Sequence, residues 1–117
     1  MSWTVTVDER LEKWLNDIPA DIKARIINIV DLLVENGPQN VREPYVKHVK
    51  GKLFEIRAKG KDGIARVFYF TITGQRIVLL HGFIKKTQKI PDKELETATA
   101  RMRDVLKAHT DKSRIDA

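Results

Sequence analysis

The strongest constraint on the fold is a run of three strand-like segments separated by short turn sequences. The segments are residues 53–59, 64–71 and 75–81, and the turns are Gly60-Lys61-Asp62-Gly63 and Thr73-Gly74. The segments are rich in β-branched and aromatic side chains, which favour strands. Short turns join antiparallel neighbours, whereas parallel strands need a long crossover. The run therefore predicts a three-stranded antiparallel sheet.

Other periodicities place helices and one more strand around this sheet. They predict a strand at 3–7, helices at 8–18 and 20–36, a loop at 39–52 with room for one short strand or turn, and a final helix after Pro91. Asp8 suits an N-cap, and Gly37-Pro38 is a typical helix stop. The last helix presents one apolar face, formed by Leu95, Ala98, Met102, Val105 and Leu106.

The order β-α-α-β-β-β-α indicates an α+β fold, in which a small, mostly antiparallel sheet packs on helices. A chain of 117 residues suits one domain with one sizeable core. We place this domain at residues 1–109 and expect residues 110–117 to form a flexible tail.

Positive charge is concentrated in the middle of the chain. Twelve of the 22 Lys and Arg residues lie between Val41 and Ile90, against only Glu43, Glu55 and Asp62. A phosphate backbone is the commonest partner for such a patch, because neutralising it releases condensed counterions. The charge distribution therefore predicts a nucleic-acid partner.

Composition argues against several other classes of site. The chain has no cysteine, which excludes disulfides and thiolate zinc sites. Its histidines, at 48, 81 and 109, lack the spacing of metal ligands. We therefore expect no metal or other cofactor. No signal pattern or membrane-spanning run is visible, so a cytoplasmic location is expected.

The hairpin register places two arginines together. If the four-residue turn pairs Lys59 with Ile64, then Arg57 lies opposite Arg66, and the other face of the sheet is continuously apolar. If Thr73-Gly74 is a two-residue loop, His81 also lies opposite Arg66, although Thr-Gly is not the preferred pair for such a loop. One end of this face would then gather Arg57, Arg66, His81 and Lys59.

Two interpretations of the arginine pair remain open. Facing guanidiniums repel unless an acid or an anion lies between them. Glu55, two residues from Arg57, can serve as a structural counterion. Alternatively the pair binds a phosphate, whose oxygens match the arginine fork. Lys85 and Lys86 follow shortly in the sequence and favour this second interpretation.

Such a site suits RNA cleavage by internal transesterification, in which the ribose 2′-OH attacks the neighbouring phosphorus. Cations at the phosphoryl oxygens stabilise the charge that develops in the transition state. A base must take the 2′ proton and an acid must protonate the leaving 5′ oxygen. His81 suits one role because imidazole titrates near neutrality, and Glu55 or Glu43 suits the other. A lone histidine at a strand end is, however, more often a residue that makes a structural hydrogen bond.

Three stretches of the sequence resemble one known family. They are Leu53-Phe-Glu-Ile-Arg57, Gly63-Ile-Ala-Arg-Val-Phe-Tyr-Phe70, and Ile77-Val-Leu-Leu-His-Gly-Phe-Ile-Lys-Lys-Thr-Gln-Lys-Ile-Pro91. They are similar to the RelE/HigB-type toxins of type II toxin–antitoxin systems, and most of all to a phage-derived branch of the RelE/ParE superfamily. The pattern F-x-K-K-T-x-K-x-P is fairly specific to that branch. The likeness covers about residues 3–107.

The resemblance implies a fold like that of microbial ribonucleases and a metal-independent endoribonuclease that cleaves mRNA in the ribosomal A site. It also implies a cognate antitoxin, often a helix-turn-helix protein. By position, Arg57 and Arg66 match basic residues on the family's strands, and Lys86 or Lys85 matches one after the last strand. The chain departs from the family at Glu55, where relatives often have lysine. It also lacks the tail tyrosine or histidine that some relatives use.

The predicted catalytic residues are therefore Arg57, Arg66, His81 and Lys86. The predicted RNA-binding residues are Lys47, Lys50, Lys52, Lys59, Lys61, Lys85 and Lys89. Each lysine taken alone fits a solvated side chain, and only their aggregation argues for RNA. Two other functions remain open, a gyrase poison of the ParE type and a non-catalytic RNA-binding module.

Overall fold

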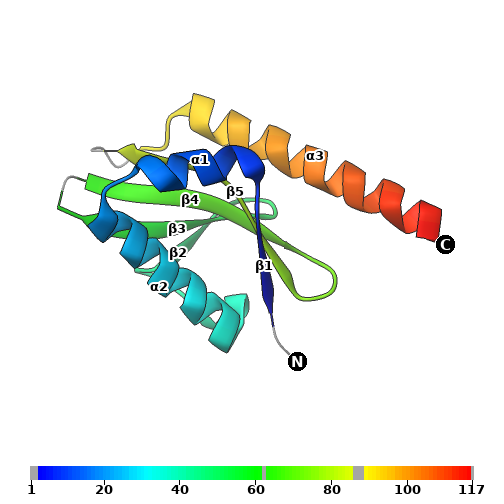
Figure 1. Ribbon diagram of the computed structural model, residues 1–117, viewed down its shortest axis with the longest axis horizontal. Coiled ribbons are helices and arrows are strands. Elements are labelled where there is room, and N and C mark those ends of the chain that lie inside the picture. The colour runs from blue at the N-terminus through cyan, green and yellow to red at the C-terminus, as the bar shows by residue number, and fades with distance from the viewer. Residues whose placement is uncertain (1–2, 62, 86–88, 117) are drawn as a thin grey trace.

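The computed structural model describes residues 3–61, 63–85 and 89–116, which fold into one layer of strands with helices on both sides (Figure 1). The elements are β1 (Thr4–Val7), α1 (Glu9–Asp17), α2 (Ala20–Asn36), a 3₁₀ turn η1 (Pro38–Asn40), β2 (Val46–Lys50), β3 (Leu53–Gly60), β4 (Gly63–Ile72), β5 (Arg76–Lys85) and α3 (Asp92–Asp116). The predicted α+β class is confirmed. The short strand that the sequence allowed within 39–52 is β2.

The described strands form a single sheet in the order β1-β5-β4-β3-β2. β1 runs parallel to β5, and every other neighbouring pair is antiparallel. The parallel pair is possible because α1 and α2 lie in the long connection that leaves β1. β2 therefore forms the edge opposite β1.

The predicted register of the first hairpin is confirmed. Arg57 pairs with Arg66, and Ala58 pairs with Ala65. Directly opposite residues share a face of the sheet, so the two arginines project together. The turn between Gly60 and Gly63 fixes this register because a one-residue slip would expose the apolar set.

The predicted register of the second hairpin is wrong. Its loop has three residues, Thr73–Gln75, and the backbone φ angles of Gly74 and Gln75 are +90° and +56°. This loop moves the pairing by one residue, and a bulge at Leu80 moves it by one more. His81 therefore lies opposite Phe68 and not opposite Arg66. Each one-residue shift of the register moves the side chains of β5 to the other face of the sheet, and the second shift moves them back. His81 therefore still projects to the same face as Arg66.

One face of the sheet packs against α1 and α2, and we call it the α1/α2 face. Its buried residues come from both helices and four of the strands: Leu11, Ile22, Ile26, Ile29, Leu33, Val46, Ile56, Ala58, Ala65, Val67, Tyr69, Ile77 and Leu79. The apolar stripe of α2 recurs at helical spacing, which directs it onto the sheet. Asp8 caps α1 as predicted, because its side chain accepts a hydrogen bond from the backbone N–H of Arg10.

The opposite face, which we call the α3 face, carries a second apolar cluster. Its buried members are Leu53, Phe68, Phe70, Val78, Leu80 and Ala98, with Leu95, Met102, Val105 and Leu106 packed against them. The predicted apolar face of the last helix is confirmed. α3 itself continues to Asp116, through most of the segment predicted as a tail, and its C-terminal end projects past the strands in Figure 1. The flexibility of that segment stays a prediction.

Candidate phosphate-binding site

A pocket of about 280 Å³ opens on the α3 face beside the edge strand β2. Its described lining residues are Lys47, His48, Val49, Glu55, Arg57, Arg66 and Ile90. Strand alternation brings Glu55 and Arg57 to this face from β3, while Arg66 comes from β4. The pocket therefore contains both arginines predicted as catalytic and the acid predicted to lie near them.

Glu55 lies between the two guanidiniums. Its Oε1 accepts a hydrogen bond from Arg66 Nη1 at 2.6 Å, and Arg57 Nε lies 4.0 Å from the same oxygen. Glu55 and Arg66 are buried, whereas the Arg57 side chain is 24% exposed. The structural interpretation of Glu55 as a counterion is therefore correct for Arg66. Of the two arginines, Arg57 is the one that solvent reaches.

Lys85 adds a third cation to this group. It projects from β5 to the same face and is only 7% exposed. Burial lowers the pKa of Lys85, and repulsion from Arg66 and Arg57 lowers it further, while Glu55 opposes the shift. We call Glu55, Arg57, Arg66 and Lys85 the Glu55 cluster. The cluster contains three basic side chains and one carboxylate, so basic groups are in excess.

Three buried polar atoms of the Glu55 cluster have no hydrogen-bond partner among the described residues: Glu55 Oε2, Arg66 Nε and Lys85 Nζ. A buried unsatisfied donor or acceptor costs about 1–3 kcal/mol. Two of these atoms are donors on cations; Arg66 lines the pocket, where the oxygen of an anion could accept from it, whereas Lys85 does not line the pocket. The third is a carboxylate oxygen that can accept a hydrogen bond. The arrangement suits a phosphate beside a general base.

His81 lies apart from the Glu55 cluster. Its Nε2 is 2.6 Å from Glu94 Oε2, and its ring stacks on Phe68 with the two rings 6.4 Å apart. The side chains of His81 and Glu94 are 17% and 21% exposed, so both are largely shielded from solvent. His81 thus has the structural hydrogen bond that one interpretation required. A role for His81 in proton transfer stays a prediction.

Glu94 was missed from the sequence, and so was the contact of Arg101 with the bulge. Arg101 Nη1 donates to the carbonyl oxygen of Leu80 at 2.9 Å, where the bulge interrupts the ladder. The sequence contained only a weak indication that Glu94 contacts another residue. An acid in the first turn of a helix is usually explained by the helix dipole alone.

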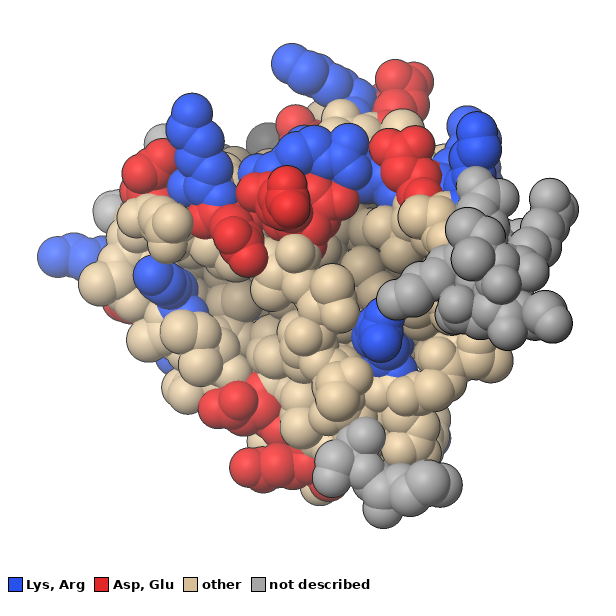
Figure 2. Space-filling model, turned by 45° about the vertical axis from the view of Figure 1, so that its right-hand side comes forward, with Lys and Arg blue, Asp and Glu red and all other residues tan. Residues whose placement is uncertain are grey.

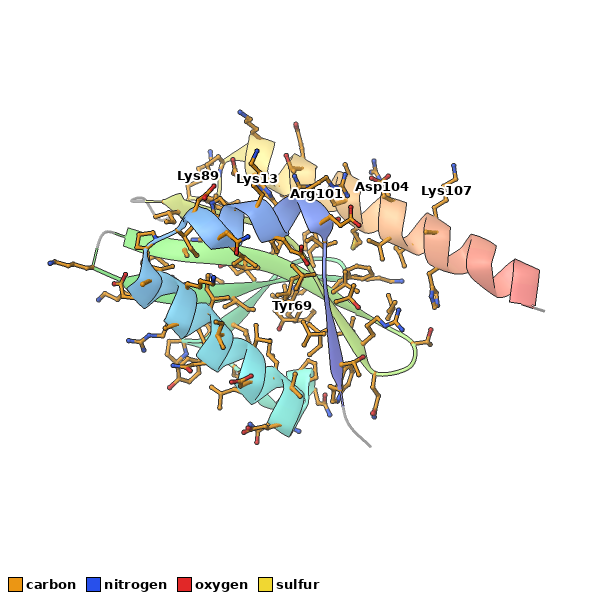
Figure 3. The ribbon with its side chains drawn as sticks, viewed as in Figure 1. Lys13, Tyr69, Lys89, Arg101, Asp104 and Lys107 are labelled. Atoms are coloured by element: carbon orange, nitrogen blue, oxygen red, sulfur yellow. The ribbon has the colours of Figure 1, made fainter. Side chains whose placement is uncertain are left out.

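The predicted RNA-binding lysines are spread over several elements, and their role stays a prediction. Lys47 lines the pocket of the Glu55 cluster, whereas Lys50 and Lys52 line a separate pocket of about 470 Å³ beside α3. The remaining ones are Lys59 and Lys61, exposed near the β3–β4 turn, Lys89, labelled near α3 in Figure 3, and Lys85, described above. Lys86, predicted as catalytic, lies outside the described residues.

The helices carry charge of both signs. Figure 2 shows acidic and basic side chains interleaved along the upper edge of the molecule, above a mostly uncharged band. One such contact joins α1 to α3, where Arg10 Nη1 lies 3.5 Å from Asp104 Oδ2. Arg10 also holds the pKa of Asp8 below its usual value through a side-chain hydrogen bond. This edge is therefore not a second basic surface.

Within residues 3–61, 63–85 and 89–116, no three histidine or carboxylate side chains lie close enough together to hold a metal ion. In the same part of the chain, no helix combines the length and the apolar character that a membrane span requires.

Comparison with known proteins places the chain in a family. A family model described as phage-derived protein Gp49-like (DUF891) matches residues 13–103. Among solved structures, a free-state arginine-to-alanine mutant of E. coli toxin RelE matches with a TM-score of 0.63 and 15% identity, covering 86% of this chain and 98% of that one. The archaeal RelE–RelB complex from Pyrococcus horikoshii OT3 matches with a TM-score of 0.53 and 26% identity, covering 72% and 96%. No curated protein matches the sequence. The chain belongs to the Gp49-like family of phage-derived proteins, and its fold is that of the RelE toxins.

Proposed function

We propose that this chain is the toxin of a toxin–antitoxin pair and an endoribonuclease that cleaves mRNA on the ribosome in the cytoplasm. The observation that carries the proposal is the Glu55 cluster. Glu55 pairs with Arg66 and lies near Arg57 at a pocket, and Lys85 is buried on the same face of the sheet. Membership of a RelE-like family and the match to a RelE–RelB complex support the antitoxin partner, which we expect to be a helix-turn-helix protein. Neither a metal nor another cofactor enters the proposal.

The proposed chemistry is internal transesterification. The 2′-oxygen attacks phosphorus while its proton passes to Glu55 Oε2. The bond from phosphorus to the 5′ oxygen then breaks, and that oxygen takes a proton from Lys85. The products are a 2′,3′-cyclic phosphate and a free 5′-hydroxyl. A lysine whose pKa is lowered gives up its proton more readily, which suits Lys85 to this role.

The two arginines receive different roles in this scheme. Arg57, the more exposed of the two, binds the phosphoryl oxygens and stabilises their developing charge. Arg66 acts as a positioning residue, because its ion pair fixes the Glu55 carboxylate. Lys86 and His81 remain candidates for the acid in place of Lys85. We expect the remaining predicted lysines to contact mRNA or ribosomal RNA.

Induced expression tests the proposal. Growth should stop, and primer extension should reveal cuts within translated messages. Arg57→Ala should abolish both effects, since removing one transition-state donor costs about 10²–10³ in rate. Arg25→Ala, an exposed arginine on α2, is the matched control and should leave toxicity unchanged.

Two other outcomes would refute the proposal. Growth arrest with intact messages and induced DNA-damage signalling would identify a gyrase poison of the ParE type. Absence of toxicity, together with RNA affinity that survives Arg57→Ala, would identify a non-catalytic binding module.

A further inference from the structure

A second hollow lies across the edge strand β2 from the Glu55 cluster. It has a volume of about 490 Å³, and its described lining residues are Pro38, Gln39, Val41, Arg42, Glu43, Val46, Lys47, His48 and Phe54. Lys47 and His48 line both this hollow and the pocket of the Glu55 cluster. The two depressions therefore adjoin along β2, whose outer edge pairs with no other described strand.

Two rings line this hollow, those of Phe54 and His48. Phe54 is 36% exposed, so part of its ring is open to the hollow that it lines. Its ring stacks on buried Tyr69 with the ring centres 5.7 Å apart, and His48 meets it edge-on at 5.0 Å. We call His48, Phe54 and Tyr69 the aromatic platform. Figure 3 labels Tyr69, and burial raises its pKa to about 12.

The aromatic platform is held rigidly by its neighbours. His48 Nε2 lies 2.8 Å from the carbonyl oxygen of Gly51, which fixes the imidazole ring. Tyr69 is 1% exposed and belongs to the core of the α1/α2 face. Phe54 is thus supported from beneath and keeps part of its surface open. A rigid ring of this kind loses little conformational entropy on binding a ligand.

The rim of the hollow is suited to a nucleotide. Arg42 and Lys47 supply positive charge, and among the described lining residues Glu43 is the acid that offsets part of it. The side-chain amide of Gln39 can both donate to and accept from the edge of a base. Unpaired bases in single-stranded RNA stack on aromatic side chains, and each such contact is worth about 1–3 kcal/mol.

We propose that the aromatic platform binds an unstacked base of single-stranded RNA, next to the phosphate held at the Glu55 cluster. This rests on the proposed function, because the RNA strand must cross β2 to reach both depressions. The shared residues Lys47 and His48 lie where the connecting backbone would pass. The basic rim attracts any anionic chain, and it is the exposed ring of Phe54 that favours a nucleic-acid base over an acidic peptide strand paired with the β2 edge.

Binding of a non-cleavable oligonucleotide tests the inference separately from catalysis. The probe is a short single-stranded RNA with 2′-O-methyl groups, followed by fluorescence anisotropy. Phe54→Leu keeps an apolar side chain but removes the stacking ring, and should weaken binding about tenfold. Phe54→Trp should retain binding. Tyr45→Leu is the matched control, because Tyr45 is 43% exposed and lines neither depression.

An abasic version of the same oligonucleotide locates the contact. With one base removed at the platform position, the parent protein should bind as weakly as Phe54→Leu, and the two losses should not add. Equal affinity of the Leu variant and the parent for the intact probe would overturn the inference. The inference would also be overturned if Phe54→Leu lost binding of the antitoxin but kept binding of the RNA probe. A chain that binds the probe through Phe54 but cuts no message would instead refute only the nuclease proposal.

Discussion

Glu55 and Arg66 form a buried ion pair that joins β3 to β4 across the α3 face, with Oε1 and Nη1 2.6 Å apart. The pair is diagonal in the ladder, since Glu55 lies opposite Phe68 and Arg66 lies opposite Arg57. The same carboxylate therefore neutralises Arg66 and stays within 4.0 Å of Arg57. A facing arginine pair is tolerated in this sheet because of that one acid.

The first prediction concerns the stability that this pair provides. Glu55→Ala should lower the free energy of unfolding by about 3–5 kcal/mol, because it leaves buried Arg66 without its counterion. Urea denaturation would measure the loss. The double variant Glu55→Leu with Arg66→Met should recover much of it, since it removes both buried charges. A double variant no more stable than Glu55→Ala would contradict this account of the pair.

The second prediction concerns the pH dependence that Lys85 imposes. Its pKa in the folded protein lies below the ordinary value of 10.5, so the folded state binds fewer protons than the unfolded state just below pH 10.5. Stability contributed by this group should therefore rise as pH increases through that window. Urea titrations at pH 8, 9 and 10 would measure the slope. Lys85→Met should reduce it, and the control Lys13→Met, at an exposed lysine of α1, should not; equal slopes in all three proteins would refute the assignment.

The third prediction concerns the attachment of α3. The hydrogen bond between His81 and Glu94 ties the first turn of α3 to β5. Glu94→Ala should destabilise the protein by about 1.5–3 kcal/mol, the range for a hydrogen bond to a charged group, and should speed amide exchange in α3. Glu94→Gln keeps a hydrogen-bonding group and should have a smaller effect. Glu96→Ala, an exposed acid on the same helix, is the control. Unchanged exchange in Glu94→Ala would show that apolar contacts alone hold α3.

The comparison of sequence and structure shows which features local patterns determine. The pairing of Arg57 with Arg66 was predictable because a four-residue turn and a continuous apolar face allow one register. The position of His81 was not, because neither the positive φ of Gln75 nor the bulge at Leu80 has a local sequence signature. The approximate bounds predicted for α2 agree with the structure, since Pro19 and Gly37 flank the helix.

The site was only partly predictable for a related reason. That Glu55 is near the arginines follows from strand alternation, but the burial of Glu55, Arg66 and Lys85 depends on how distant segments pack over them. Sequence spacing cannot report such burial. The aromatic platform was missed for the same reason. In the sequence, Phe54 and Tyr69 have the pattern of ordinary core residues, and only the structure shows that the helices leave part of Phe54 exposed.

The last prediction concerns Gly82, which lies on β5 next to His81. A methyl group added there would lie about 2.5 Å from Trp14 Cζ3 of α1, too close for any real contact. Gly82→Ala should therefore destabilise the protein by about 1–3 kcal/mol, the usual range for overpacking. Trp14→Leu removes the clashing ring but leaves a cavity, so it too should destabilise on its own.

Combined, the two changes at Gly82 and Trp14 should be less harmful than the sum of the single losses, because each relieves the defect that the other creates. Thermal denaturation of the four proteins in this cycle would measure the coupling. Strictly additive losses would mean that α1 shifts away from β5 instead of resisting the new methyl group. In that case the contact between Trp14 and Gly82 would not determine where α1 lies on the sheet.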